Sequence, residues 1–434
     1  MTDAIGVSLL GAGNVGGGVI RALAAGADRY AAAVGRRLEL RHVLVRDASR
    51  PRDGVEPHQL TTDLDTVLGD DRTSIVVELM GGEEPARSYI AEALGSSRHV
   101  VTANKEVIAK HGAALRDLAA EGGVRLLYEA SVGGGIPIIS PLFRDLLAND
   151  ITAVTAIING TTNYMLTAMA QDGADYADAL ADAQRLGYAE PDPTADVEGH
   201  DAAFKLAILC GLAFHVEVSP EDVVQRGITQ LTARDIRYAS TLGYAIKLIA
   251  EGRLADGELL ASVQPTLIAR DEPLSKVDGV LNAVQVEGDL VGRVVLEGPG
   301  AGAAPTASAV LADVLEVARD VATGRLPPEA ATYAPARVRP PDRILTRHYL
   351  RLTVADHAGV LAGIAGILGR HEISLASVIQ VEADARARTA EIVITTHPAI
   401  AGRLQEALGE IAALEGEVLE VGSVLPIYAD GSAR

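Results

Sequence analysis

The first part of the chain alternates short apolar runs with longer stretches of helical spacing. Strand-length apolar runs occur at 5–10, 38–45, 74–80 and 99–103, and helical patterns follow the first, third and fourth of them. Such alternation predicts right-handed strand-helix-strand crossovers and a mostly parallel, doubly wound sheet. We therefore expect an α/β domain over roughly the first 130 residues.

The middle of the chain mixes strand-like and helical patterns. A strand-like run at 151–160 precedes several helical segments between Asn163 and Ala250, and further strand-like stretches follow at 258–268 and 281–298. This mixture predicts an α+β domain in which helices cover one sheet.

The last part of the chain has a different organisation. Proline and alanine are dense over 324–343, a composition typical of a linker. From 348 to 428 the pattern then runs strand, helix, strand, strand, helix, strand. That order is the ferredoxin-like βαββαβ arrangement, and a third domain fits a chain of 434 residues.

Composition excludes several classes of protein. The formal net charge of −20 repels nucleic-acid backbones and anionic membrane surfaces, and 48% hydrophobic residues are typical of a globular protein. The single cysteine, Cys210, lies in the apolar run "LAILCGLAF", so we expect a buried, inert thiol and no disulfide framework. No apolar run reaches the roughly 20 residues of a membrane helix, and the N-terminal stretch lacks a signal-peptide pattern. We expect a soluble, cytoplasmic protein.

A glycine-rich turn follows the first strand. In "VSLLGAGNVGGGVI", Gly11, Gly13 and Gly16 form a G-x-G-x-x-G pattern at the opening of a helix, with Asn14 and Val15 inside it. Such glycines allow a tight turn and let a pyrophosphate approach the N–H groups of the helix N-terminus. The pattern predicts a Rossmann-like, dinucleotide-binding domain, although a plain glycine-rich turn is the alternative.

Two basic residues stand where a dinucleotide would bind. Arg46 is the first polar residue after the second strand, where a guanidinium pairs with the 2′-phosphate of NADP, but the adjacent Asp47 leaves NAD open. Lys105 begins a helix after "VVTAN", at the edge where open α/β sheets bind ligands. The helix dipole disfavours a cation there, which indicates a compensating anion or reacting group. A surface lysine is the alternative.

An acidic segment precedes an apolar helix. In "GYAEPDPTADVEGHDAAFKLAIL" five carboxylates lie between Glu190 and Asp201, and Asp201 and Lys205 share one face of the predicted helix. The helix is apolar on nearly every side after Lys205, so its polar first turn should open onto a polar cavity. Acids there suit a substrate ammonium, and the amine suits proton exchange. An ordinary helix ion pair is the alternative, while a calcium loop lacks the required spacing.

Together these motifs resemble one enzyme family. "GAGNVG", "TANK", "EASVGGGIPI", "NGTTNY" and "GYAEPDPTADVEGHDAAFK" resemble the homoserine dehydrogenase family over almost the whole chain, and the last module resembles an ACT domain entered through "DHAGVL". The resemblance implies NAD(P)-dependent interconversion of L-homoserine and L-aspartate 4-semialdehyde in threonine, methionine and isoleucine biosynthesis. It implies a dinucleotide-binding domain at 1–132 plus about 303–322, a substrate-binding and dimerisation domain at 133–302, a linker at 323–345 and an ACT regulatory domain at 346–430.

The resemblance also assigns roles by position. Lys205 is the expected proton donor and acceptor, and Lys105 is a second catalytic residue at the cofactor edge. The implied cofactor is NADP, with NAD as the alternative, and the implied cation is sodium. Threonine is the expected effector, and the implied assembly is a homodimer or a tetramer. The other assigned residues are Gly11, Gly13, Asn14, Val15, Gly16, Arg46, Thr102 and Gly302 for the cofactor, Gly187, Glu190, Asp196 and Asp201 for the substrate, Glu129, Val132, Gly134 and Ile136 for the cation, and Asp356, Gly359 and Val360 for regulation.

Two rival functions make different demands on the sequence. A semialdehyde dehydrogenase that acts through a thioester needs an accessible cysteine nucleophile, and Cys210 is the only candidate. An amino-acid sensor with an inactive nucleotide domain would not need the glycines or the two lysines. Both features are intact here, which favours the dehydrogenase.

Overall fold

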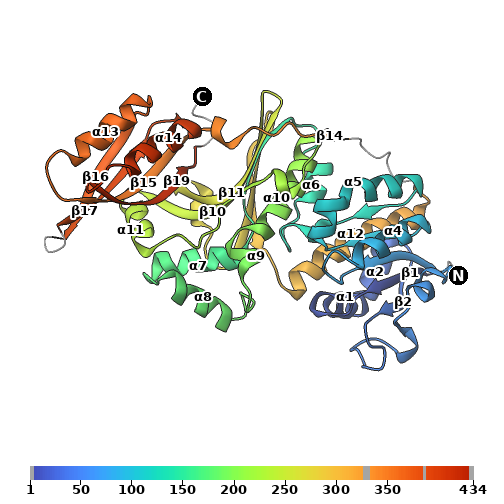
Figure 1. Ribbon diagram of the computed structural model, residues 1–434. Helices are drawn as coiled ribbons and strands as arrows, with labels where there is room; N and C mark the ends of the chain where they lie inside the picture. Colours follow the sequence, from blue (N-terminus) through green and yellow to red (C-terminus); the bar gives the residue numbers. More distant parts are fainter. Residues whose placement is uncertain (1–3, 326–332, 385–387, 430–434) are drawn as a thin grey trace. The chain divides into compact units, whose positions relative to one another are not determined.

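The computed structural model describes residues 4–325, 333–384 and 388–429 (Figure 1). Residues 326–332 of the predicted linker lie outside the described residues, as do the ends of the predicted first and last domains and residues 385–387. The chain divides into two compact units. The first comprises Met1–Val154, Phe204–Asp222 and Asn282–Ala336, and the second comprises Thr155–Ala203, Val223–Leu281 and Arg337–Arg434.

A parallel six-stranded sheet forms the core of the first unit (Figure 1). Its strand order is β3-β2-β1-β4-β5-β6, the doubly wound order predicted from the apolar runs. The central strand β1 is buried at all six positions, as expected where both faces of a parallel sheet are covered. The strands are β1 (Ile5–Leu10), β2 (Leu38–Leu44), β3 (Leu60–Thr61), β4 (Thr73–Glu78), β5 (His99–Thr102) and β6 (Leu126–Leu127).

Helices from both ends of the first unit pack on this sheet. Val310, Val314 and Val317 of the late helix α12 share one hydrophobic cluster with residues of β1, α1 and α2. Helices α1 and α12 lie so close together that a Cβ on Gly18 would be 3.0 Å from the carbonyl oxygen of Ala303. The helices are α1 (Asn14–Ala25), α2 (Ala27–Val34), α3 (Leu64–Leu68), α4 (Ala86–Gly95), α5 (Lys105–Glu121), α6 (Ile139–Phe143) and α12 (Ala303–Thr323).

Other segments of the first unit lie outside the parallel sheet. Strands β12 (Leu281–Gly288) and β13 (Gly292–Pro299) are neighbours in a mixed sheet, and β14 (Ala334–Pro335) pairs in parallel with β8 (Val216–Glu217). Among the described residues, three elements have residues in both units. They are β7 (Ile151–Ile157), α10 (His200–Phe214) and β12, of which only Leu281 belongs to the second unit.

The second unit contains a long hairpin where the sequence pattern predicted a helix. Residues up to Ala250 were expected to be helical, but β10 (Tyr244–Ala255) pairs with β11 (Glu258–Ala269) over twelve consecutive residues. Cross-strand pairing overrides local spacing in such segments. The remaining elements here are α7 (Gly160–Gln171), α8 (Tyr176–Arg185), α9 (Thr194–Val197), β9 (Val224–Gln225) and α11 (Ala233–Thr241).

The C-terminal part of the second unit has the predicted βαββαβ order. Its sheet continues from β11 through a parallel contact between Leu267 and Ile427, giving the order β10-β11-β19-β15-β17-β16. Its helices cover their own hydrophobic cluster. The elements are β15 (Leu345–Ala355), α13 (Val360–Arg370), β16 (Leu375–Asp384), β17 (Thr389–Thr396), β18 (Ala399–Ile400), α14 (Ala401–Ala412) and β19 (Val418–Ile427).

A buried ionic network joins α11 to this C-terminal sheet. The Nε of Arg351 on β15 donates to Asp235 on α11 at 2.7 Å, and Arg351 also lies 3.5 Å from Glu391 on β17. Tyr238 of α11 donates to the same Glu391. The three charged residues are each no more than 6% exposed, so the network fixes the module against α11. Among the described residues, no helix is both long and apolar enough to cross a membrane.

Candidate active site

The glycine-rich turn has the geometry that its sequence predicts. Gly11 has φ +104°, and a Cβ there would lie 2.7 Å from the carbonyl oxygen of Leu79. A Cβ on Gly16 would lie 2.3 Å from the carbonyl oxygen of Gly11, so only glycine lets α1 approach the turn this closely. A Cβ on Gly13 would meet nothing within 4 Å, so that side of the turn is open to a ligand.

A pocket of about 400 Å³ opens at this turn. The predicted Gly13 and Asn14 line it, and Ala303, which follows the predicted Gly302 at the start of α12, lines it too. The N-terminus of α1 faces the pocket with its unpaired N–H groups, a favourable environment for a pyrophosphate. The lining residues are Ala12, Gly13, Asn14, Gly17, Ile20, Arg21, Arg52, Asp53 and Ala303.

The arginines of this pocket are not the one expected. Arg46 is exposed at the end of β2 and does not line the pocket, whereas Arg21 and Arg52 do. Arg21 follows the glycines on α1, and Arg52 lies six residues beyond Arg46 in the loop after β2. The signal for Arg52 was present, because the loop "RDASRPRD" carries three arginines, but sequence alone does not show which one turns inward.

Lys105 begins α5 beside a buried polar network. Asn104 caps the helix by accepting from the N–H of Val107, and its amide donates to the carbonyl of Gly82 at 2.8 Å. The predicted Thr102 donates to Glu78 at 2.6 Å. Burial raises the pKa of Glu78, while its hydrogen bonds, led by the one from Thr102, act against that shift. The network fixes the first turn of α5 and so positions the backbone of Lys105.

The predicted cation loop is organised by Glu129. Its carboxylate accepts from the N–H groups of Ile138, Ile139 and Ser140 at 2.6, 2.9 and 2.6 Å, which caps the start of α6. Gly134 has φ +57° and its Cβ would lie 2.3 Å from the carbonyl oxygen of Gly300. Because the Glu129 side chain is engaged, a cation would have to be held by backbone carbonyl groups of the loop. The described residues contain no cluster of three or more His, Cys, Asp or Glu side chains placed to hold a metal ion.

Asn159 joins two of the predicted substrate carboxylates. Its amide nitrogen donates to Asp196 at 2.7 Å and to Asp201 at 3.0 Å. Its amide oxygen accepts from the N–H of Thr162, so the same side chain caps α7. Asn159 is 5% exposed and Asp201 is 6% exposed. The motif "NGTTNY" does not by itself reveal this role of Asn159, because the contact with Asp201 spans 42 residues.

Three further predicted residues belong to the same stretch of the chain. Glu190 is exposed and its carbonyl accepts from Gln184 at 3.1 Å. Gly187 turns the chain after α8 with φ +78°. Lys205 lies on α10, one helical turn after Asp201, and is half-buried.

The predicted regulatory residues form the entrance to α13. Gly359 has φ +105° and precedes Val360, the first residue of the helix, which is 2% exposed. Asp356 is exposed and its N–H donates to the carbonyl of Arg388 at 2.8 Å. This turn leaves the first N–H groups of α13 available for an effector carboxylate.

The thiol required by a rival mechanism is not accessible. Cys210 lies on α10 with 0% exposure, and burial raises its thiol pKa well above the ordinary value. A thiolate nucleophile is therefore disfavoured at this position. The expectation of a buried cysteine is confirmed.

Comparisons with known proteins agree along the chain. Family models described as "Homoserine dehydrogenase, NAD binding domain", "Homoserine dehydrogenase" and "ACT domain" match residues 11–129, 137–315 and 348–416. The chain is 42% identical over 436 residues to the homoserine dehydrogenase of Corynebacterium glutamicum, covering 99% of this chain and 96% of that relative.

Solved structures give the same result. The crystal structure of a homoserine dehydrogenase from Thiobacillus denitrificans matches with a TM-score of 0.92 and 40% identity, covering 98% of each chain. A hyperthermophilic archaeal homoserine dehydrogenase in complex with NADPH matches with a TM-score of 0.62 and 28% identity, covering 76% of this chain and 100% of that one.

Proposed function

The chain belongs to the homoserine dehydrogenase family, and from this premise we propose how its residues carry out the reaction. It is an NAD(P)-dependent oxidoreductase that interconverts L-homoserine and L-aspartate 4-semialdehyde. A bound nicotinamide would supply the hydride chemistry at C4 of homoserine in both directions. The chain itself must bind the cofactor, orient the amino alcohol and exchange the hydroxyl proton.

The glycine-turn pocket is the proposed cofactor site. The open side of Gly13 and the N-terminus of α1 accommodate the pyrophosphate. Arg21 and Arg52 provide cationic partners for a 2′-phosphate, which favours NADP over NAD. A similar archaeal enzyme is known in complex with NADPH. The rate of aspartate 4-semialdehyde reduction, measured with NADPH and with NADH on the same preparation, tests this preference.

The pair of acids held by Asn159 carries the substrate proposal. Asp196 and Asp201 share one amide and retain further lone pairs for the ammonium of homoserine, and Glu190 and Gly187 complete the binding loop. Lys205 removes the hydroxyl proton while the hydride leaves C4, and it returns that proton in the reverse reaction. Lys105 assists at the cofactor edge.

Further properties follow from the family premise as proposals. A sodium ion binds to backbone carbonyls of Glu129, Val132, Gly134 and Ile136. Threonine binds at the loop that precedes α13 and regulates the enzyme. The chain forms a homodimer or a tetramer, acts in the cytoplasm, and supplies the biosynthesis of threonine, methionine and isoleucine.

The role of Lys205 is tested by substitution. Lys205→Ala should lower kcat for homoserine oxidation by on the order of 10²- to 10⁴-fold, because the general base is lost. Binding of NADPH, followed by nicotinamide fluorescence, should be unchanged. Lys276→Ala, an exposed lysine in the second unit, serves as the matched control and should keep full activity. Normal turnover by Lys205→Ala would show that another group moves the proton.

A further inference from the structure

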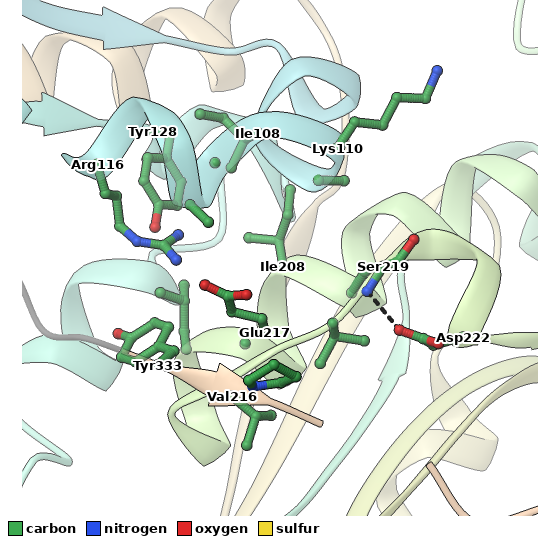
Figure 2. Close-up of a pocket in the computed structure, with 18 residues that line it drawn as sticks. Ile108, Lys110, Arg116, Tyr128, Ile208, Val216, Glu217, Ser219, Asp222 and Tyr333 are labelled. Carbon is green, nitrogen blue, oxygen red and sulfur yellow. Dashed lines mark hydrogen bonds between the residues drawn. The ribbon is translucent and has the colours of Figure 1, made fainter. Parts of the chain in front are cut away.

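A second pocket, of about 320 Å³, lies within the first unit and shares no lining residue with the glycine-turn pocket (Figure 2). Residues of α5 form one wall, residues of α10 form another, and β8 and β14 close a third side. Neither Lys105 nor Lys205 lines it, and none of the carboxylates proposed to bind the substrate does so. The pocket is therefore distinct from the proposed catalytic residues.

Two opposite charges face this pocket from different walls. Figure 2 shows the guanidinium of Arg116 on α5 and the carboxylate of Glu217 on β8 turned toward the same space. The guanidinium carbon of Arg116 instead lies 4.9 Å from the ring centroid of Tyr333, and its charge acts against the raised pKa of the neighbouring Tyr128. Within the described part of the chain, neither Arg116 nor Glu217 forms an ion pair.

The ring of Tyr333 packs against the guanidinium, and Tyr128 lies beside it. Tyr128 is 3% exposed, and burial raises its pKa to about 12, so its hydroxyl stays neutral. Tyr333 is 7% exposed and also contacts the ring of His215 edge-on at 5.7 Å. A guanidinium stacked on an aromatic ring keeps its outer N–H donors free for a carboxylate. Arg116 is thus held in position to bind a carboxylate. Glu217 does not provide that carboxylate, because the two residues form no ion pair among the described residues.

We propose that this pocket binds a small α-amino acid with an aliphatic side chain. The α-carboxylate pairs with Arg116, the ammonium pairs with Glu217, and the side chain packs against Ile108 and Ile208. A simple anion bound at Arg116 would bring a like charge toward Glu217, and a simple cation bound at Glu217 would bring a like charge toward Arg116. Only a zwitterion matches both charges.

The position of the pocket gives such a ligand a route to the reaction. α5 begins with Lys105 and α10 carries Lys205, and the two helices touch where Lys110 lies 5.7 Å above the ring of Phe204. A ligand wedged between α5 and α10 therefore acts on both lysine-bearing helices. This consequence rests on the proposed roles of the lysines, whereas binding itself does not.

Hydrogen exchange of the full-length protein with L-alanine, L-valine or L-leucine tests the site. These probes carry no hydroxyl that the enzyme can oxidise. We expect protection of peptides from 108–116 and 216–219 with at least one of them at millimolar concentration. Isobutylamine and isobutyrate, which each carry one of the two charges, should give no protection.

Paired variants locate the charges. Arg116→Gln and Glu217→Gln should each weaken binding of the protecting amino acid at these peptides by about tenfold or more, the usual cost of losing a charged hydrogen bond. Arg72→Gln and Glu121→Gln, exposed residues of the same unit, should leave it unchanged. Glu217 is exposed, so its variant tests the site even where Arg116→Gln unfolds. Absence of protection with all three amino acids, or protection unaffected by Glu217→Gln, would overturn the proposal.

Discussion

At the scale of single residues, the side chain of Asn159 joins the start of α7 to two of the proposed substrate carboxylates. Its oxygen caps α7 and its two amide hydrogens hold Asp196 and Asp201 together. Two carboxylates this close repel each other unless donors are supplied between them. The amide therefore holds both acids in one orientation, which suits an ammonium.

Asn159→Ala should raise KM for homoserine and lower stability. Removal of the amide leaves the acids without their shared donor, which costs about 10- to 100-fold in KM, and loss of the cap costs about 1 kcal/mol of unfolding free energy. Steady-state kinetics and thermal unfolding measure the two effects. Asp63→Ala, which removes the cap of α3 in the first unit, should lower stability but leave KM unchanged. An unchanged KM in Asn159→Ala would remove Asn159 from the substrate site.

At the scale of elements, the local sequence pattern predicted most of the strands and helices and the glycine turn. The parallel strands and the βαββαβ module follow from apolar runs, and the glycine turn follows from steric limits within six residues. Tyr244–Ala255 was misassigned because "YAIKLIA" fits both helical and strand spacing, and only its pairing with β11 decides. The roles of Arg52 and Asn159 could not be predicted from local patterns either. Arg52 lines a pocket together with Ala303, and Asn159 contacts Asp201, so both depend on residues far away in the sequence.

Gly16→Ala should separate α1 from the glycine turn. The added Cβ meets the carbonyl oxygen of Gly11 at 2.3 Å, and neither atom belongs to a flexible side chain, so the backbone must move. We expect about tenfold weaker NADPH binding and a loss of about 1–3 kcal/mol of stability. Fluorescence titration and urea unfolding measure both.

The matched substitution is Gly409→Ala on α14. A Cβ there meets nothing within 4 Å, so helix propensity alone should raise stability by up to about 1 kcal/mol without changing cofactor binding. If both variants behaved alike, the close approach of α1 to the turn would not explain the requirement for glycine.

At the scale of the whole molecule, the placement of charged and titratable groups determines how stability depends on pH. The chain carries a net charge of −20, and the buried Arg351 and Asp235 form an ion pair with each other. His348 of β15 differs from them, since it is 7% exposed and its Nδ1 has no hydrogen-bond partner among the described residues. A buried imidazole of this kind makes stability depend on pH.

Burial, aided by the charge of Arg226, lowers the pKa of His348 from 6.5 to about 4. Above pH 6.5 the ring is neutral in the folded and unfolded states and contributes no pH dependence. As the pH falls from 6.5 to about 4, the unfolded chain takes up a proton that the folded chain refuses, so this residue destabilises the fold by on the order of 3 kcal/mol. In His348→Gln that loss is absent, and the unfolding free energy, measured by urea titration across this range, should fall less steeply than in the parent. His58→Gln, an exposed histidine, should follow the parent curve. Parallel curves for His348→Gln and the parent would mean that the imidazole is protonated in the folded state.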